Sequence, residues 1–196
     1  VLDCALSGFS VAASRAGAGQ DGYGLITQRE QASLIVPAIM SVFERLELDP
    51  KALDAVFVTS GPGSFTGLRV GAATAQGYAL AADCPVYSLS SLQLLAYAAT
   101  KVEPDFNVYA ACIKSKSDDL YFQIFDSYYQ PIDKPSLIGF DRLYERMNGQ
   151  SRVCFVGNVD KEMMQPLLST VEETIFLLTD IVNEASLLGF ASEIIK

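Results

Sequence analysis

The chain has 196 residues, of which 50% are hydrophobic and 19% charged, so it is a globular chain with room for one domain or two small ones. Its 14 Lys and Arg against 23 Asp and Glu give a net charge of −9, which argues against a protein that binds nucleic acid by itself. It has no histidine, which excludes Ser-His-Asp and Cys-His hydrolases and histidine-ligated metal sites.

The first half of the chain has the patterns of an α/β lobe. In chain order they predict strands at 1–5, 9–14 and 23–27, a helix at 30–46, a strand at 54–59, a glycine-rich turn at 61–67, a helix at 68–82, a strand at 85–89 and a helix at 91–99. Pro37 lies inside the first helix, where it removes a backbone donor. Three antiparallel strands followed by α/β units are typical of a ribonuclease-H-like layout.

The amino-acid composition changes at residues 101–105, and we place a lobe boundary between 102 and 103. After it the patterns predict strands at 108–113 and 120–125 joined as a hairpin, a strand at 137–140, a helix at 141–147, a strand at 153–157, and helices at 162–168 and 184–195. The second lobe, 103–196, therefore reads as a shorter variation on the first, 1–102.

The four cysteines are not spaced as C-x-x-C, and their apolar surroundings predict reduced, mostly buried thiols. No apolar run is long enough to span a membrane and no signal peptide is visible, so we expect a cytoplasmic protein without membrane contact. Val1 lies inside a strand pattern, and we expect a methionine and a few residues to precede it.

The most specific segment is TSGPGSFTGLRVG at residues 59–71, between a predicted buried strand and a predicted helix. Gly61, Gly63 and Gly67 can take positive φ or let another backbone approach closely. The spacing differs from that of a Walker loop, because no lysine follows Gly67, and from the dinucleotide pattern G-x-G-x-x-G. The loop is therefore either a structural turn or a phosphate-binding loop of another kind.

The other candidate residues of this motif loop are Ser64, Phe65, Thr66 and Arg69. Ser64 and Thr66 can cap the following helix. Phe65 is expected to be a packing anchor rather than a platform on which a base stacks.

A stripe of small residues follows, since Gly67, Gly71 and Ala75 recur every fourth residue. Such a stripe permits close approach of another element, which is either the sheet below or a helix of a partner. Both predicted helices of this region carry more apolar surface than one core face needs. This favours contact with a helix of a partner over contact with the sheet alone. The predicted interface comprises Leu34, Ile35, Ala38, Val42, Leu68, Gly71, Ala72, Ala75 and Ala79.

The motif and the helix before it resemble the signature of the YeaZ/TsaB family, the dimerisation subunits of the bacterial tRNA threonylcarbamoyladenosine machinery. The similar positions are 1–5, 9–12, 34–39, 61–71 and 76–85 in the first lobe and, more weakly, Tyr121 and 155–158 in the second. The chain departs from the family at Ser33, where relatives carry Glu, and at Lys114-Ser115-Lys116, where they often carry an acid, an alanine and an arginine.

The resemblance implies two ribonuclease-H-like lobes of the sugar-kinase/Hsp70/actin type. It further implies a non-catalytic subunit that activates a larger TsaD-type transferase, which holds the iron and the nucleotide. A small TsaE-type ATPase would be a further partner, tRNA would be reached only through the complex, and the free protein could form a homodimer.

The alternative is a nucleotide-dependent ATPase or kinase of the same superfamily. Such enzymes need a carboxylate at the end of the first strand of each lobe to hold Mg²⁺. The first lobe offers Asp3, which we expect to accept backbone hydrogen bonds in a loop instead, and the second offers Lys114. A glycoprotease would need histidine ligands that are missing. We therefore expect no catalytic residue, metal or cofactor in this chain.

Overall fold

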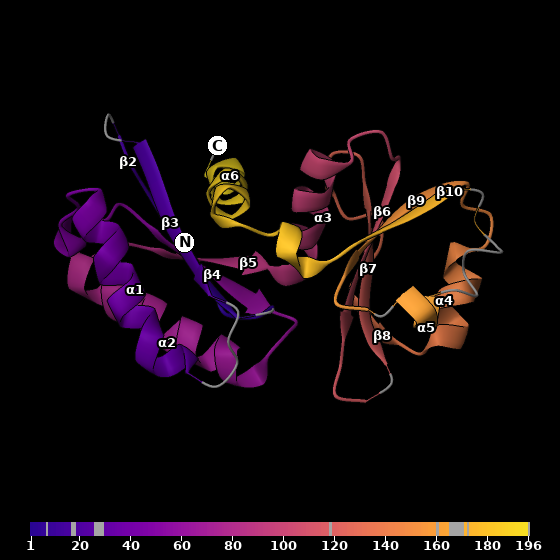
Figure 1. Ribbon diagram of the computed structural model, residues 1–196, viewed down its shortest axis with the longest axis horizontal. Helices are drawn as coiled ribbons and strands as arrows, with labels where there is room; N and C mark the ends of the chain where they lie inside the picture. The colour runs from indigo at the N-terminus through magenta and orange to yellow at the C-terminus, as the bar shows by residue number, and fades with distance from the viewer. Residues whose placement is uncertain are drawn as a thin grey trace. The chain divides into compact units, whose positions relative to one another are not determined.

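The computed structural model describes residues 1–6, 8–16, 19–25, 30–117, 119–159, 161–164, 171 and 173–195, without the side chains of 25, 161, 163 and 181. The chain divides into two compact units, one made of Val1–Ser91 and Val182–Lys196 and the other of Leu92–Ile181. Within the described residues each unit contains a five-stranded mixed sheet (Figure 1).

The sheet of the first unit has the order β3-β2-β1-β4-β5. Its strands are β1 (Leu2–Asp3), β2 (Phe9–Arg15), β3 (Gly19–Leu25), β4 (Val56–Gly61) and β5 (Val86–Ser90). β1, β2 and β3 pair antiparallel, whereas β4 runs parallel to β1 and β5. Leu2 lies opposite Val11 on β2 and Val58 on β4, so the carboxyl ends of β1 and β4 reach the same edge of the sheet.

Helices α1 (Gln31–Arg45) and α2 (Phe65–Ala82) lie side by side against this sheet (Figure 1). The core forms where apolar residues of α1, spaced three and four apart, meet the sheet. Its buried members include Leu2, Val11, Ile35, Ile39, Val42, Val58, Ala75 and Ala79. A short 3₁₀ turn, η1 (Pro50–Ala52), leads into β4.

The last helix, α6 (Glu184–Ile194), returns to the first unit and packs on β2 and β3. Asn183 caps it, because its side-chain oxygen accepts a hydrogen bond from the Ser186 N–H at 2.9 Å. Glu184 lies over Gly22 and Gly24 of β3, where a Cβ on Gly22 would overlap its side chain. Glycine in β3 therefore makes the room that α6 needs.

The second unit repeats the strand order of the first, read as β8-β7-β6-β9-β10. Its elements are α3 (Ser91–Val102), β6 (Val108–Lys114), β7 (Leu120–Asp126), β8 (Ser136–Ile138), α4 (Phe140–Met147), β9 (Arg152–Gly157), α5 (Lys161–Met164), β10 (Glu173–Leu177) and η3 (Thr179–Ile181). β6 and β7 form the predicted antiparallel hairpin, and β9 runs parallel to both β6 and β10. The prediction that the second lobe repeats the arrangement of the first is thus confirmed.

The two observed units differ in two ways from the lobes predicted on either side of a boundary between 102 and 103. Helix α3 groups with the second unit, where the Gln93 side chain donates to the Tyr129 carbonyl and the Tyr97 and Tyr129 rings meet edge to face. Helix α6 groups with the first unit. Strand β10 was not predicted, and residues 165–170 of the predicted helix 162–168 lie outside the described residues.

Candidate docking face and glycine loop

The glycine loop follows β4 at the edge where β1 also ends. Gly61 and Gly63 have φ values of +102° and +157°, which favour glycine. Helix α2 begins at Phe65, earlier than predicted, because the Ser64 side chain accepts the Gly67 N–H at 3.2 Å and caps the first turn. Ser64 as a cap is confirmed, whereas Thr66 lies inside the helix and is exposed.

The glycines permit close contact between this loop and the residues after β1. The Ser64 N–H donates to the Ala5 carbonyl at 2.8 Å. A Cβ on Gly63 would lie 2.2 Å from the same carbonyl oxygen, and one on Gly67 would lie 1.8 Å from the carbonyl oxygen of Cys4. Real side chains do not tolerate such approaches, so Gly63 and Gly67 serve to seat α2 on the end of β1. This supports the structural-turn interpretation of the motif.

Asp3 ends β1 and is buried beneath this contact. One carboxylate oxygen accepts the Thr59 hydroxyl at 2.7 Å and the Ala5 N–H at 3.0 Å. Desolvation raises the pKa of this carboxyl, while the hydrogen bonds from Ala5, Thr59 and Leu6 oppose the shift. The prediction that Asp3 binds loop N–H groups is confirmed for Ala5.

The end of β1 does not offer a free carboxylate to a magnesium-bound nucleotide. The Asp3 carboxylate is covered and committed to protein donors, and the corresponding strand of the second unit, β6, ends at Lys114. The Lys114 N–H donates to the Asn158 side chain at 2.7 Å, which ties β6 to the segment after β9. Among the described residues no group of three or more Cys, Asp or Glu is placed to hold a metal ion.

The small-residue stripe of α2 faces the sheet. Gly67, Gly71, Ala75 and Ala79 are all buried, and a Cβ on Gly71 would already contact Cys4 and Val58 at 3.4 Å. The prediction that Gly71, Ala75 and Ala79 contact a partner is therefore wrong, because the stripe is used to bring α2 close to β1 and β4.

Three further residues of the predicted interface are also directed inwards. Ile35, Ala38 and Val42 are buried in the core of the first unit. Leu34, Leu68 and Ala72 are only partly exposed. The two helices were identified correctly as unusually apolar, but most of the residues chosen from them lie on the core side. A partner contact through Leu34, Leu68 or Ala72 stays a prediction.

The outer faces of α1 and α2 carry exposed apolar side chains. Val36 and Met40 of α1 are 47% and 45% exposed, and Phe65 and Leu80 of α2 are 59% and 85% exposed. Along α2 the exposed stripe contains Phe65, Arg69, Ala73, Gln76 and Leu80, the order expected for one face at 3.6 residues per turn. Sequence reasoning missed this face, although the apolar residues left over after the core face is filled could have indicated it.

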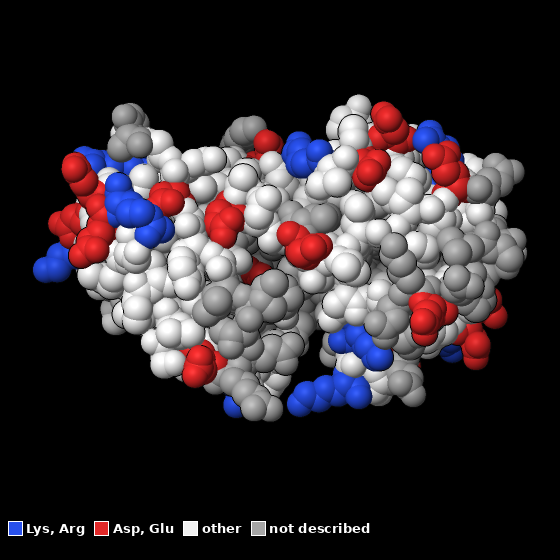
Figure 2. Space-filling model, viewed as in Figure 1, with Lys and Arg blue, Asp and Glu red and all other residues white. Residues whose placement is uncertain are grey.

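Charge is nearly absent from these two helices. Arg69 is the one charged residue of α2, and α1 has only Glu44 and Arg45 at its C-terminal end. In Figure 2 the part of the surface over α1 is mostly white, and red and blue atoms gather near the C-terminal end of that helix. A surface helix of a monomer normally has a charged outer face, so we define Val36, Met40, Phe65, Arg69 and Leu80 as the docking face.

Phe65 was expected to be a packing anchor, and this is wrong. It is the first residue of α2 and points outwards, where the Arg69 guanidinium carbon lies 4.0 Å from the ring centroid. This cation–π pair keeps an aromatic surface and a charge together at the amino end of the docking face. Large aromatic and Arg side chains are enriched among the residues that dominate binding energy at interfaces.

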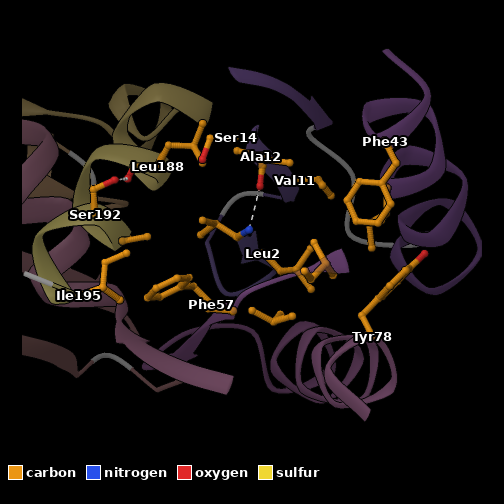
Figure 3. A pocket seen from close by; sticks show the side chains of 17 residues that line it. Leu2, Val11, Ala12, Ser14, Phe43, Phe57, Tyr78, Leu188, Ser192 and Ile195 are labelled. Carbon is orange, nitrogen blue, oxygen red and sulfur yellow. Dashed lines mark hydrogen bonds between the residues drawn. The ribbon is translucent and has the colours of Figure 1, made fainter. Parts of the chain in front are cut away.

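An apolar cavity of about 130 Å³ lies at the other end of β1 from the glycine loop. Figure 3 shows its lining, which comes from α1, α2, α6 and the strands between them and includes Phe43, Phe57, Tyr78 and Leu188. The amino group of Val1 donates to the Ala12 carbonyl at 2.7 Å beside it. Among the described residues, no Asp, Glu, Lys or Arg side chain lines the cavity.

The cysteines are free thiols, as predicted, and Cys4, Cys112 and Cys154 are buried. Burial, with a smaller contribution from the Asp3 charge, raises the pKa of Cys4 to about 12, and burial raises the pKa of Cys112 as well. Thiols of this kind are protonated near neutral pH and make poor nucleophiles.

Two units with the same mixed strand order define an α/β protein of the actin-like class. A Bacteroides thetaiotaomicron protein with an actin-like ATPase fold and unknown function aligns at a TM-score of 0.51 and 12% identity over 97% of this chain and 94% of that chain. YeaZ from Pseudomonas aeruginosa aligns at a TM-score of 0.76 and 21% identity over 98% of this chain and 90% of that chain. No helix of the described residues is long and apolar enough to cross a membrane.

The family model described as TsaD, tRNA N6-adenosine threonylcarbamoyltransferase, matches residues 25–149, and the chain belongs to this family. Within it the chain is of the YeaZ/TsaB type. It is 40% identical over 97 residues to the tRNA threonylcarbamoyladenosine biosynthesis protein TsaB of Haemophilus influenzae. The matched segment covers 50% of this chain and 41% of that relative.

Proposed function

We propose that this protein is a non-catalytic cytoplasmic subunit that binds and activates a TsaD-type transferase in threonylcarbamoyl modification of the adenosine beside the tRNA anticodon. The observation that carries the proposal is the docking face, an exposed apolar surface on two nearly uncharged helices. Its relatives named as threonylcarbamoyladenosine biosynthesis proteins support the pathway. A small TsaE-type ATPase would join the same complex, and tRNA would bind only to the assembly.

The alternative of a nucleotide-dependent enzyme has less support. Asp3 is buried and bonded to Thr59, and Lys114 stands where the second carboxylate would be needed. Calorimetric titration of the protein with ATP and Mg²⁺ should release no binding heat in the micromolar range. Micromolar binding would favour the enzyme instead.

Leu80→Glu tests the docking face directly. Because Leu80 is 85% exposed, its replacement leaves the free fold unchanged. Burying a leucine at an interface is worth about 1.5–3 kcal/mol, so the variant should bind the TsaD-type partner about 10- to 100-fold more weakly. Leu137→Glu, at a 54% exposed position of β8 in the second unit, is the matched control.

Calorimetry or surface plasmon resonance with the purified partner gives both affinities. Equal binding by wild type and Leu80→Glu would move the interface elsewhere on the chain. Failure of the wild type to bind a TsaD-type partner would refute the proposed function.

A further inference from the structure

Three buried polar side chains of the first unit converge on the segment after β1. Asp3 and Gln31 are each 4% exposed and Thr59 is 2% exposed, and they lie on β1, α1 and β4. Each makes a hydrogen bond within the first unit, as buried polar groups must if they are not to destabilise the fold. We call Asp3, Gln31 and Thr59 the polar hub.

The hub fixes the exit of β1 to β4. The Thr59 hydroxyl donates to Asp3 and lies 3.4 Å from the Cys4 nitrogen, whose N–H it accepts. The same Asp3 oxygen accepts the Ala5 N–H. Cys4 is therefore held by a side chain of β4, and Ala5 is held by the last residue of β1 itself.

Those two residues in turn support the first turn of α2. The Ala5 carbonyl accepts the Ser64 N–H, and the carbonyls of Cys4 and Ala5 fill the places that side chains on Gly67 and Gly63 would take. Phe65 directly follows Ser64. The amino end of the docking face thus rests on the backbone that Asp3 and Thr59 hold.

Gln31 connects the amino end of α1 to the same point. Its side-chain nitrogen donates to the Gly8 carbonyl at 2.7 Å, and its oxygen lies 3.1 Å from where a Cβ on Gly67 would be. Glu30, the residue before the helix, provides no side-chain cap. Gln31 therefore links the start of α1 to the segment between β1 and β2 and lies beside Gly67 in the first turn of α2.

We propose that the polar hub is a positioning device for the docking face, in which Asp3, Gln31 and Thr59 set the relative placement of the first turns of α1 and α2. This inference rests on the proposed function for the identity of the partner. It differs from simple stabilisation of the fold, because loss of the hub misplaces Phe65 and Val36 while most of the core of the first unit stays packed.

Thr59→Val removes the hydroxyl at constant shape, and Thr59→Ser restores it. We expect Thr59→Val to bind the TsaD-type partner at least tenfold more weakly at a temperature where it is fully folded, and Thr59→Ser to bind within twofold of wild type. Leu188→Ala, in the apolar core contact of α6, is the control for stability alone and should leave affinity unchanged.

Amide hydrogen exchange separates this inference from the proposed function. Thr59→Val should speed exchange at least tenfold in the first turns of α1 and α2 of the free protein, with little change at their C-terminal ends. If the wild type binds no TsaD-type partner but this exchange pattern is found, the function fails and the hub stands. Wild-type affinity in Thr59→Val, or equal weakening in Leu188→Ala, would overturn the hub.

Discussion

Gly67→Ala adds one methyl group at the point where α2 meets the exit of β1. The new Cβ would lie 1.8 Å from the Cys4 carbonyl oxygen, whereas ordinary contact begins at 3.4 Å. The atoms that the new Cβ would overlap are backbone atoms of Cys4, and hydrogen bonds hold this segment in place. Either α2 or β1 must therefore move by well over an ångström. Overpacking of this kind destabilises by about 1–3 kcal/mol.

Helix propensity opposes this loss, because alanine is favoured over glycine in a helix by roughly 1 kcal/mol. The net expectation for Gly67→Ala is a loss of about 0–2 kcal/mol, and each kcal/mol lost lowers the melting temperature by about 2–4 °C in a chain of this size. Gly77→Ala is the matched control in the same helix, where an added Cβ meets nothing within 4 Å. It should stabilise the protein by about 0.5–1 kcal/mol.

Urea unfolding followed by circular dichroism measures both variants against the wild type. Because the same chemical change is made twice in one helix, the difference between the two variants isolates the contact with Cys4. A Gly67→Ala protein as stable as Gly77→Ala would show that α2 is not seated on the β1 exit.

Three further outcomes can be checked. Because burial raises the pKa of Asp3, the folded state holds its proton more tightly than the unfolded state, whose pKa is near 3.8. The free energy of unfolding should therefore fall as the pH rises from about 4 through the raised pKa, and Asp3→Asn should flatten this slope in urea titrations; parallel slopes would contradict it. Gly22→Val should overlap Glu184 and displace α6, seen as faster amide exchange in α6, whereas unchanged exchange would mean that β3 yields instead. At a net charge of −9 the isolated protein should bind tRNA weakly in filter-binding assays, and tight, salt-sensitive binding would contradict the charge argument.

The order of elements could be predicted well because periodicity reports secondary structure directly. The helix at 30–46, the strand before the glycine loop and the 108–125 hairpin were each predicted within a few residues of their observed ends. The domain boundary was not, because the chain passes between units at Ser91, inside a strand-to-helix junction that has no linker composition. Local sequence does not encode that α3 packs with the second unit and α6 with the first.

The site was harder to predict than the fold. The glycine motif indicated a special loop, but not that Gly63 and Gly67 face the backbone of Ala5 and Cys4, which are far away in sequence. A stripe such as Gly71 and Ala75 permits close approach by a sheet or by a partner with equal ease, and only the register of α2 on β4 decides. The prediction that Phe65 is a packing anchor in the loop was wrong because α2 begins at Phe65, three residues before the predicted start.

The return of α6 to the first unit also determines when that unit can be completed during synthesis. Residues 182–195 pack on β2 and β3, yet they leave the ribosome only after the whole second unit has been made. At about 5–20 residues per second, the nascent first unit waits roughly 5–20 s for its last helix. During that time the face of β2 and β3 is open, and Gly22 and Gly24 lack the Glu184 side chain that covers them. A chain interrupted late in translation would therefore lose the integrity of its first unit while keeping a complete second one.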